Sequence, residues 1–247
     1  NKFKLNNLLL GYSWENSYKN TSVSYPAALK WVQFNTVQGW LLDVRPEWKK
    51  DSDDRATSFW RANGALNYGF SEQKVRGSLK VQRRFDSIKY RTLSLEGGTT
   101  TEQFNDRTPI SSIINTSYSL FAKRNYMKLY DKTFARMEYS QILRTGISFL
   151  GAAEWAQRGW LDNTSSFSYK RKTTREYTSN EPVPTLDPEQ PGIIEPANLF
   201  ILQAQFVFRV KQQYSSYPKY RAYQDSNWPE FILSYKSAIP LGGSDWA

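Results

Sequence analysis

Alternation between apolar and polar residues, sustained over long runs, is the feature that most limits what this chain can fold into. Trp60, Leu66 and Tyr68 share one phase of such a run, and Arg61 and Asn67 lie in the other. A period of two residues places successive side chains on opposite faces of a β-strand. Strands of soluble proteins average about 5 to 6 residues, whereas a tilted strand needs about 9 to 11 to cross a bilayer. Several runs of about ten residues therefore favour a membrane β-barrel.

The same alternation marks the other expected strands. The clearest run extends from Thr36 to Lys49, and taken alone it fits a half-buried strand of a soluble sandwich equally well. Short turns at residues 71–73 and 144–146 join neighbouring runs into hairpins. The remaining expected strands cover residues 60–70, 74–84, 89–97, 133–142, 146–157, 200–210 and 231–236. We therefore expect an all-β fold, a partial antiparallel outer-membrane β-barrel, with residues 1–247 forming a single domain.

The two phases of the alternation assign the residues to two faces. We expect the apolar face to contact lipid or to supply the aromatic girdles at the membrane interfaces. Its expected members are Trp40, Leu42, Val44, Trp48, Trp60, Leu66, Tyr68, Phe149, Trp155, Phe206 and Phe208. We expect the polar face to line the lumen of the barrel. Its expected basic members are Arg45, Arg61, Arg76, Lys80, Arg136, Arg209 and Lys236.

Two segments depart from the alternation. Between Thr108 and Phe121 apolar residues recur at helical spacing, with Thr108 as the expected N-cap and Pro109 at the first helical position. This short amphipathic helix could plug the lumen, cap one rim, lie in the membrane interface or simply pack on a sheet. Five prolines between Asn180 and Pro196 exclude regular strand pairing and predict a long, exposed polar loop.

The composition agrees with strands of two faces. Aromatic residues make up 16% of the chain, yet the mean hydropathy is only -0.66. In a membrane barrel the lipid-facing and lumen-facing residues cancel in such an average, so a polar mean does not exclude a membrane. Apolar runs such as Leu8–Leu10 are much shorter than the roughly 20 residues that a membrane-spanning helix needs.

The residue types available for chemistry are few. The chain contains neither cysteine nor histidine, which excludes disulfides, thiolate nucleophiles and the commonest metal ligands. A carboxylate pair or a Ser/Lys arrangement remains, but the 23 acidic residues show no spacing that singles out a pair. We therefore predict no catalytic residues, no metal, no cofactor and no enzymatic activity.

The net charge of +10 raises nucleic-acid binding as an alternative. Proteins that bind single strands gather lysine, arginine and aromatic residues in one groove. Here the basic residues are spread over most segments and alternate with apolar residues. Spread charge fits a lumen or a solvated face better, and it would also suit lipid phosphates or lipopolysaccharide at the barrel rims. We expect the lipid bilayer as a partner, and no nucleic acid.

Short motifs in three places resemble a known family. They are Gly11-Tyr12-Ser13-Trp14, the run from Phe34 to Trp40, and Asn125-Tyr126-Met127-Lys128-Leu129-Tyr130-Asp131-Lys132-Thr133-Phe134. They resemble the barrel region of an uncharacterised Bacteroidota outer-membrane family, whose members usually carry an N-terminal carboxypeptidase-like regulatory domain. The resemblance implies a location in the bacterial outer membrane. It also implies a regulatory domain before this chain and further strands after it. The opening Asn1-Lys2-Phe3-Lys4 is not followed by the apolar run of a signal peptide, so we expect a fragment that lacks the signal peptide, the regulatory domain and the last strands.

These observations leave three expected functions. The first is a non-enzymatic barrel that serves as a subunit or scaffold of a larger envelope complex, in protein assembly, export or nutrient uptake, with other outer-membrane or periplasmic proteins as partners. The second is a passive pore whose basic lumen favours anionic solutes. The third is a soluble β-protein that binds a glycan or a nucleic acid through exposed aromatic residues.

Overall fold

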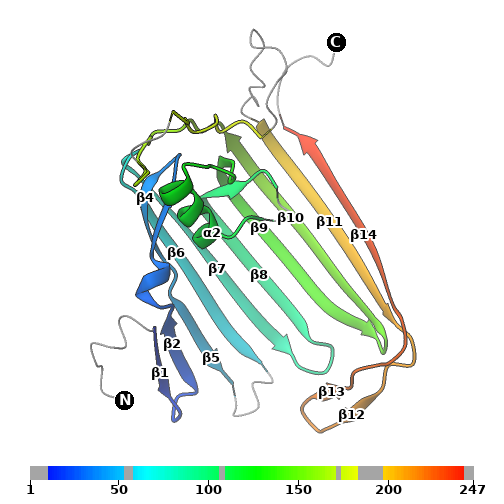
Figure 1. The fold of residues 1–247 in the computed structure, drawn as a ribbon. Helices are drawn as coiled ribbons and strands as arrows, with labels where there is room; N and C mark the ends of the chain where they lie inside the picture. Colours follow the sequence, from blue (N-terminus) through cyan, green and yellow to red (C-terminus); the bar gives the residue numbers. More distant parts are fainter. Residues whose placement is uncertain (1–10, 53–57, 106–108, 171–173, 183–196, 242–247) are drawn as a thin grey trace, which may run out of the picture.

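The structure, a computed structural model, is one large antiparallel sheet with a short helical segment over one of its faces (Figure 1). It describes residues 11–52, 58–105, 109–170, 174–182 and 197–241. The strands are β1 (Tyr12–Asn16), β2 (Thr21–Tyr25), β3 (Val32–Asn35), β4 (Gly39–Val44), β5 (Glu47–Asp51), β6 (Phe59–Gly69), β7 (Lys74–Asp86), β8 (Arg91–Gln103), β9 (Leu129–Arg144), β10 (Ile147–Gly159), β11 (Ala197–Arg209), β12 (Tyr214–Ser216), β13 (Arg221–Tyr223) and β14 (Glu230–Pro240). The helical elements are the 3₁₀ turn η1 (Ala28–Lys30), α2 (Ser112–Ser117) and the π-helical turn η2 (Tyr118–Ala122).

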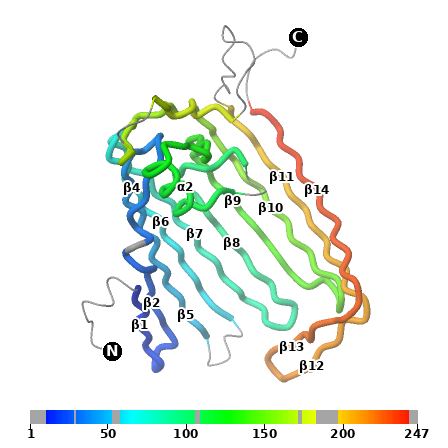
Figure 2. Tube along the Cα trace, viewed as in Figure 1, coloured from blue at the N-terminus to red at the C-terminus, as the bar shows by residue number. Residues whose placement is uncertain are grey.

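Neighbouring strands of the main sheet are nearly all consecutive in the chain. The order is β1-β2-β5-β6-β7-β8-β9-β10-β11-β14, with β4 pairing β6 and β3 pairing β4, which gives twelve strands. Among the described residues β1 and β14 do not pair, so the sheet is open there. The hairpin β12–β13 is separate and lies at the end of the strands opposite α2 (Figure 2). The expected all-β, antiparallel fold with one short helix is therefore confirmed.

The register places the expected apolar residues on one common face. Tyr68 of β6 pairs with Leu42 of β4 and with Val75 of β7, and the same phase continues through β8, β9 and β10 to β11 and β14. Every residue expected on the apolar face shares this phase. The expected basic residues share the opposite phase, which is the face on which α2 lies. Many apolar-face side chains are exposed, as with Leu66 at 58% and Leu79 at 53%.

The single strand expected from Thr36 to Lys49 is wrong. Residues 36–38 form a buried turn, and the remainder is divided into β4 and β5. Pro46 causes the division because it has no N–H to donate to the ladder. The register along β6 continues across the break, from Val44 opposite Leu66 to Glu47 opposite Asn63. The two faces of the run are therefore preserved although its pairing is interrupted.

The helix starts later than expected. It begins at Ser112, after Pro109, while the expected cap Thr108 lies outside the described residues. Gln103 accounts for part of this difference, because its side chain bonds both the N–H and the carbonyl oxygen of Ile110, at 2.8 and 2.9 Å. This pair of bonds ties the chain before the helix to the end of β8. No helix of the described residues has both the length and the apolar content to cross a membrane.

One further expected strand has different bounds, and the expected proline-rich loop is mostly untested. The strand expected at residues 89–97 begins at Arg91 and continues to Gln103. Most of the expected proline-rich loop, residues 183–196, lies outside the described residues. At its start Asn180 is 2% exposed rather than solvent-facing.

Candidate functional site

A belt of ion pairs crosses the polar face of the sheet. Arg136 bonds Glu154 of β10 at 3.2 Å, and Lys132 bonds the same carboxylate at 2.7 Å. The register explains the first contact, because Arg136 pairs directly with Glu154 and also with Glu96 of β8. Opposite charges on directly paired residues attract across an antiparallel ladder. The polar face is therefore a network of mixed charge.

The basic residues expected to line the lumen have acidic partners on this face. The ion pairs are Arg45 with Asp43, Arg61 with Glu47, Arg76 with Glu72 and Asp131, Lys80 with Glu96, Arg136 with Glu138 and Glu154, and Arg209 with Glu230. Lys236 lies on the same face of β14. Paired carboxylates cancel most of the field that unpaired cations would project into a lumen. The field that these arginines and lysines project from the polar face is therefore weaker than their positive charges alone would give.

The sheet divides between β7 and β8 at Gly98. Pairing of the two strands ends where Ser78 meets Gly98, and beyond this point β8 pairs only with β9. Gly98 has a φ of +140°, and a Cβ there would lie 2.2 Å from the carbonyl oxygen of Gly77. Only glycine fits such a backbone. The last residues of β8 therefore leave the plane of β7 and turn over its polar face.

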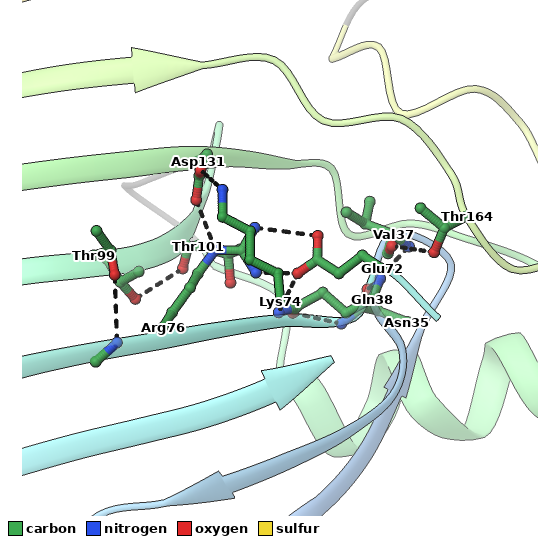
Figure 3. Close-up of polar contacts among 12 residues, drawn as sticks. Asn35, Val37, Gln38, Glu72, Lys74, Arg76, Thr99, Thr101, Asp131 and Thr164 are labelled. Carbon is green, nitrogen blue, oxygen red and sulfur yellow. Dashed lines mark hydrogen bonds and ion pairs between the residues drawn. The ribbon is translucent and has the colours of Figure 1, made fainter. Parts of the chain in front are cut away.

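Arg76 spans this division and is the largest fully buried side chain in the described structure (Figure 3). Its Nε donates to Asp131 of β9 at 2.7 Å, and its terminal nitrogens bond Glu72 in the turn before β7. Lys74 also bonds Asp131, at 2.5 Å, and the Gly77 N–H donates to the Thr99 hydroxyl at 3.4 Å. Side chains thus hold β7 to β8 and β9 where backbone pairing is missing.

The turn between β3 and β4 is buried beneath a segment that follows β10. Thr36 is completely buried, and its hydroxyl donates to the Asn163 side chain at 2.6 Å. Thr164 donates its N–H to the Thr36 carbonyl oxygen and its hydroxyl to the Val37 carbonyl oxygen, at 2.9 and 2.6 Å. The segment crosses the strand ends from β10 towards β4 (Figure 1). The segment therefore covers the strand ends at the α2 end of the sheet.

Asn180 anchors the far end of the same segment. Its Nδ2 donates to the carbonyl oxygens of Leu129 and Leu161, both at 2.6 Å, and its Oδ1 accepts the Leu129 N–H at 2.9 Å. Nearby, the Tyr177 hydroxyl lies 2.7 Å from the Ser119 carbonyl oxygen, and burial raises the pKa of this tyrosine. Polar contacts thus fix the segment at both ends.

The helical segment α2–η2 is attached to β3, next to this buried turn. The Thr116 hydroxyl accepts the Phe34 N–H at 3.0 Å and lies 3.2 Å from the Phe34 carbonyl oxygen. Asn115 is fully buried and accepts the Met127 N–H at 3.1 Å. We call α2, η2, the end of β8 and residues 160–170 and 174–182 the plug. The plug has apolar contacts in a cluster of Val37, Met127 and Leu129 with Leu161 packed against it, and in ring contacts of Phe167 with Phe34 and Trp40.

A polar cavity of about 300 Å³ remains between the plug and the sheet. Asp43 and Asn67 of the sheet lie on one side, and Thr101 and Glu102 of β8 lie on the other. Among the described residues, no group of three or more acidic side chains is placed to hold a metal ion. The cavity offers amide, hydroxyl and carboxylate groups.

One comparison with known proteins assigns the chain to a family. A family model described as the C-terminal domain of a family of unknown function (DUF5686) matches residues 5–247. The chain belongs to this family. Neither a curated protein nor a solved structure matches it. The expected resemblance to an uncharacterised family is confirmed to this extent. The division at Gly98 and the plug are features of this DUF5686 C-terminal domain.

Several residues that organise this DUF5686 domain are absent from the sequence-based assignment. They are Asn35, Glu72, Asn115, Asp131, Lys132, Glu154, Asn163 and Asn180. The alternation could have identified Lys132 and Glu154, because both lie in the polar phase of their strands. No alternation could identify the asparagines, because they fix turns and loops rather than strands.

Proposed function

We propose that the chain is part of a non-enzymatic outer-membrane β-barrel that acts as a subunit or scaffold of a larger envelope complex. The main support for this proposal is the two-faced sheet. One apolar face runs from β4 to β14, and the opposite face bears a belt of ion pairs. Exposed apolar side chains such as Leu66 and Leu79 are costly in water and favourable in lipid. The barrel would be completed by pairing at β1 and β14, because open strand edges do not occur in the hydrocarbon region.

The plug favours a scaffold over a passive pore. It covers the polar face at one end of the strands, and the basic residues of that face have carboxylate partners. A pore selective for anions would need unpaired cations along an open path. The apolar face also argues against the third expectation, a soluble binding protein, because its exposed side chains are aliphatic as well as aromatic.

Heat-modifiable migration of the full-length protein is the test. We expect protein extracted from outer membranes in mild detergent to migrate differently before and after boiling, and to bring partner chains with it. A shift without partners, combined with single-channel conductance, would support the pore instead. A protein that stays soluble without detergent and shows no shift would contradict the membrane assignment.

A further inference from the structure

Two basic residues on the apolar face differ from those on the polar face. Lys50 of β5 pairs with Trp60 of β6, and Trp60 pairs with Arg83 of β7, so the three side chains form one row across three strands. All three are exposed. We call them the Lys50–Trp60–Arg83 row. The row interrupts a face that is otherwise apolar over these strands, as its neighbours Val81 and Leu93 show.

The cations of this row lack the acidic partners found on the other face. Among the described residues, neither Lys50 nor Arg83 has a carboxylate within ion-pair distance. The Arg83 guanidinium instead lies over Trp60, with its central carbon 4.7 Å from the ring centroid. Stacking leaves the N–H edge of a guanidinium free to bond an oxyanion. Within the described ranges the row therefore presents two charges without a carboxylate partner, and a fixed set of donors.

The position of the row points to one kind of anion. Arg83 lies close to the end of β7 opposite the plug, where the following turn bonds the β12–β13 hairpin: Ser87 donates to the Lys219 carbonyl oxygen at 2.6 Å. The turns after β7 and β9 are short and lie at this end, and the two longest connections, after β8 and β10, lie at the plug end (Figure 1). The alternation has two exceptions: the short β6–β7 turn lies at the plug end, and the connection from β11 to β14, which contains the β12–β13 hairpin, lies at the end near Arg83. In outer-membrane barrels short turns are periplasmic. The row would then lie at the level of the inner leaflet.

We propose that the Lys50–Trp60–Arg83 row binds the headgroup phosphate of an anionic glycerophospholipid. The stacked Arg83 donates its N–H edge to the phosphate oxygens, Lys50 adds a second charge, and Trp60 lies at the boundary between hydrocarbon and headgroups. This inference rests on the proposed membrane barrel. It adds a specific lipid contact at a defined height, on the face away from the plug.

Native mass spectrometry of the full-length protein tests the proposal, with phosphatidylglycerol and phosphatidylcholine offered in mild detergent. We expect wild type to retain phosphatidylglycerol in preference to phosphatidylcholine. The double variant K50Q/R83Q should lose roughly tenfold or more of this preference, because each removed charge weakens attraction to an anionic headgroup. The matched control is K49Q/R61Q, which removes the same charge from the polar face of two neighbouring strands, β5 and β6. We expect it to bind like wild type.

The outcomes separate this inference from the proposed function. A normal heat shift with unchanged lipid retention in K50Q/R83Q would overturn the row while leaving the barrel intact. Equal loss in both double variants would overturn it as well, since any positive charge would then suffice. Complete displacement of the lipid by millimolar inorganic phosphate would show a site for free phosphate instead. If wild type neither shifts on heating nor enters membranes, the barrel and the row are both wrong.

Discussion

Among the ion-paired residues, Arg76 is the one whose substitution should lower the free energy of unfolding most. Its side chain is fully buried and bonds Glu72 and Asp131 where β7 pairs with β6 but not with β8. Arg76→Met leaves these two carboxylates together with only Lys74 near them. Removing one partner of a buried ion pair costs about 3–5 kcal/mol, so we expect the free energy of unfolding to fall by about that amount. Urea titration followed by the loss of heat-modifiable migration measures it.

Arg209→Met is the control for this prediction. Arg209 also pairs with a carboxylate, Glu230, but the two side chains are 42% and 38% exposed. Exposed ion pairs contribute about 0–1 kcal/mol, so this variant should unfold close to the wild-type urea concentration. Equal destabilisation by the two substitutions would show that the buried network at the β7–β8 division has no special role in stability.

The partners of Arg76 show where alternation stops being informative. Its place on the polar face follows from its phase in the strand. Asp131, however, shares the phase of Thr133 and Ala135, which belongs to the apolar face. Only the departure of β8 and β9 from the plane of β7, beyond Gly98, brings Asp131 over the polar face. This contact depends on a bend between strands, which the period of two residues does not encode.

At the scale of the strands, Gly98 should tolerate no side chain. Gly98→Ala places a Cβ against the Gly77 backbone at a φ of +140°, so the bend must open or the β7–β8 ladder must shift. We expect much less folded, heat-modifiable protein in the membrane fraction. Gly77→Ala is the control, because its Cβ would meet its nearest neighbours at 3.5 and 3.6 Å, which is ordinary contact. Normal assembly of Gly98→Ala would contradict the proposed need for glycine at the bend.

The segment after β10 should release its contacts at alkaline pH. Burial raises the pKa of Tyr177 above its usual value of 10.0, so the folded state holds the proton more tightly than the unfolded state. Its stabilising contribution is complete below pH 10 and is lost as the pH rises through the folded-state pKa. Protease cleavage within residues 174–182 should therefore increase above about pH 10. Tyr177→Phe cannot ionise, and its cleavage should not follow this rise; identical profiles would disprove the assignment to Tyr177.

The elements that sequence predicted well are those with two paired neighbours. The runs that became β6, β7, β9, β10 and β11 have long ladders on both sides, so their alternation reflects two real faces. The single strand expected from Thr36 to Lys49 was wrong for two reasons. Its first residues form a turn beneath the plug, and Pro46 interrupts its backbone pairing. The asparagines that anchor the plug act through single hydrogen bonds, which leave no periodic signal in a sequence.

For the whole molecule, the two-faced sheet predicts an alternating environment along a single strand. The chain contains no cysteine, so single substitutions can be labelled without removing native thiols. Leu79→Cys and Val81→Cys lie on the apolar face of β7, and Ser78→Cys and Gln82→Cys lie on the polar face. In reconstituted full-length protein, an environment-sensitive fluorophore at the first pair should emit at shorter wavelength and be quenched by brominated lipid. The second pair should show neither effect. Alternation of both signals along β7 would place the apolar face in lipid, whereas uniform signals would indicate that this face is covered by protein or exposed to water.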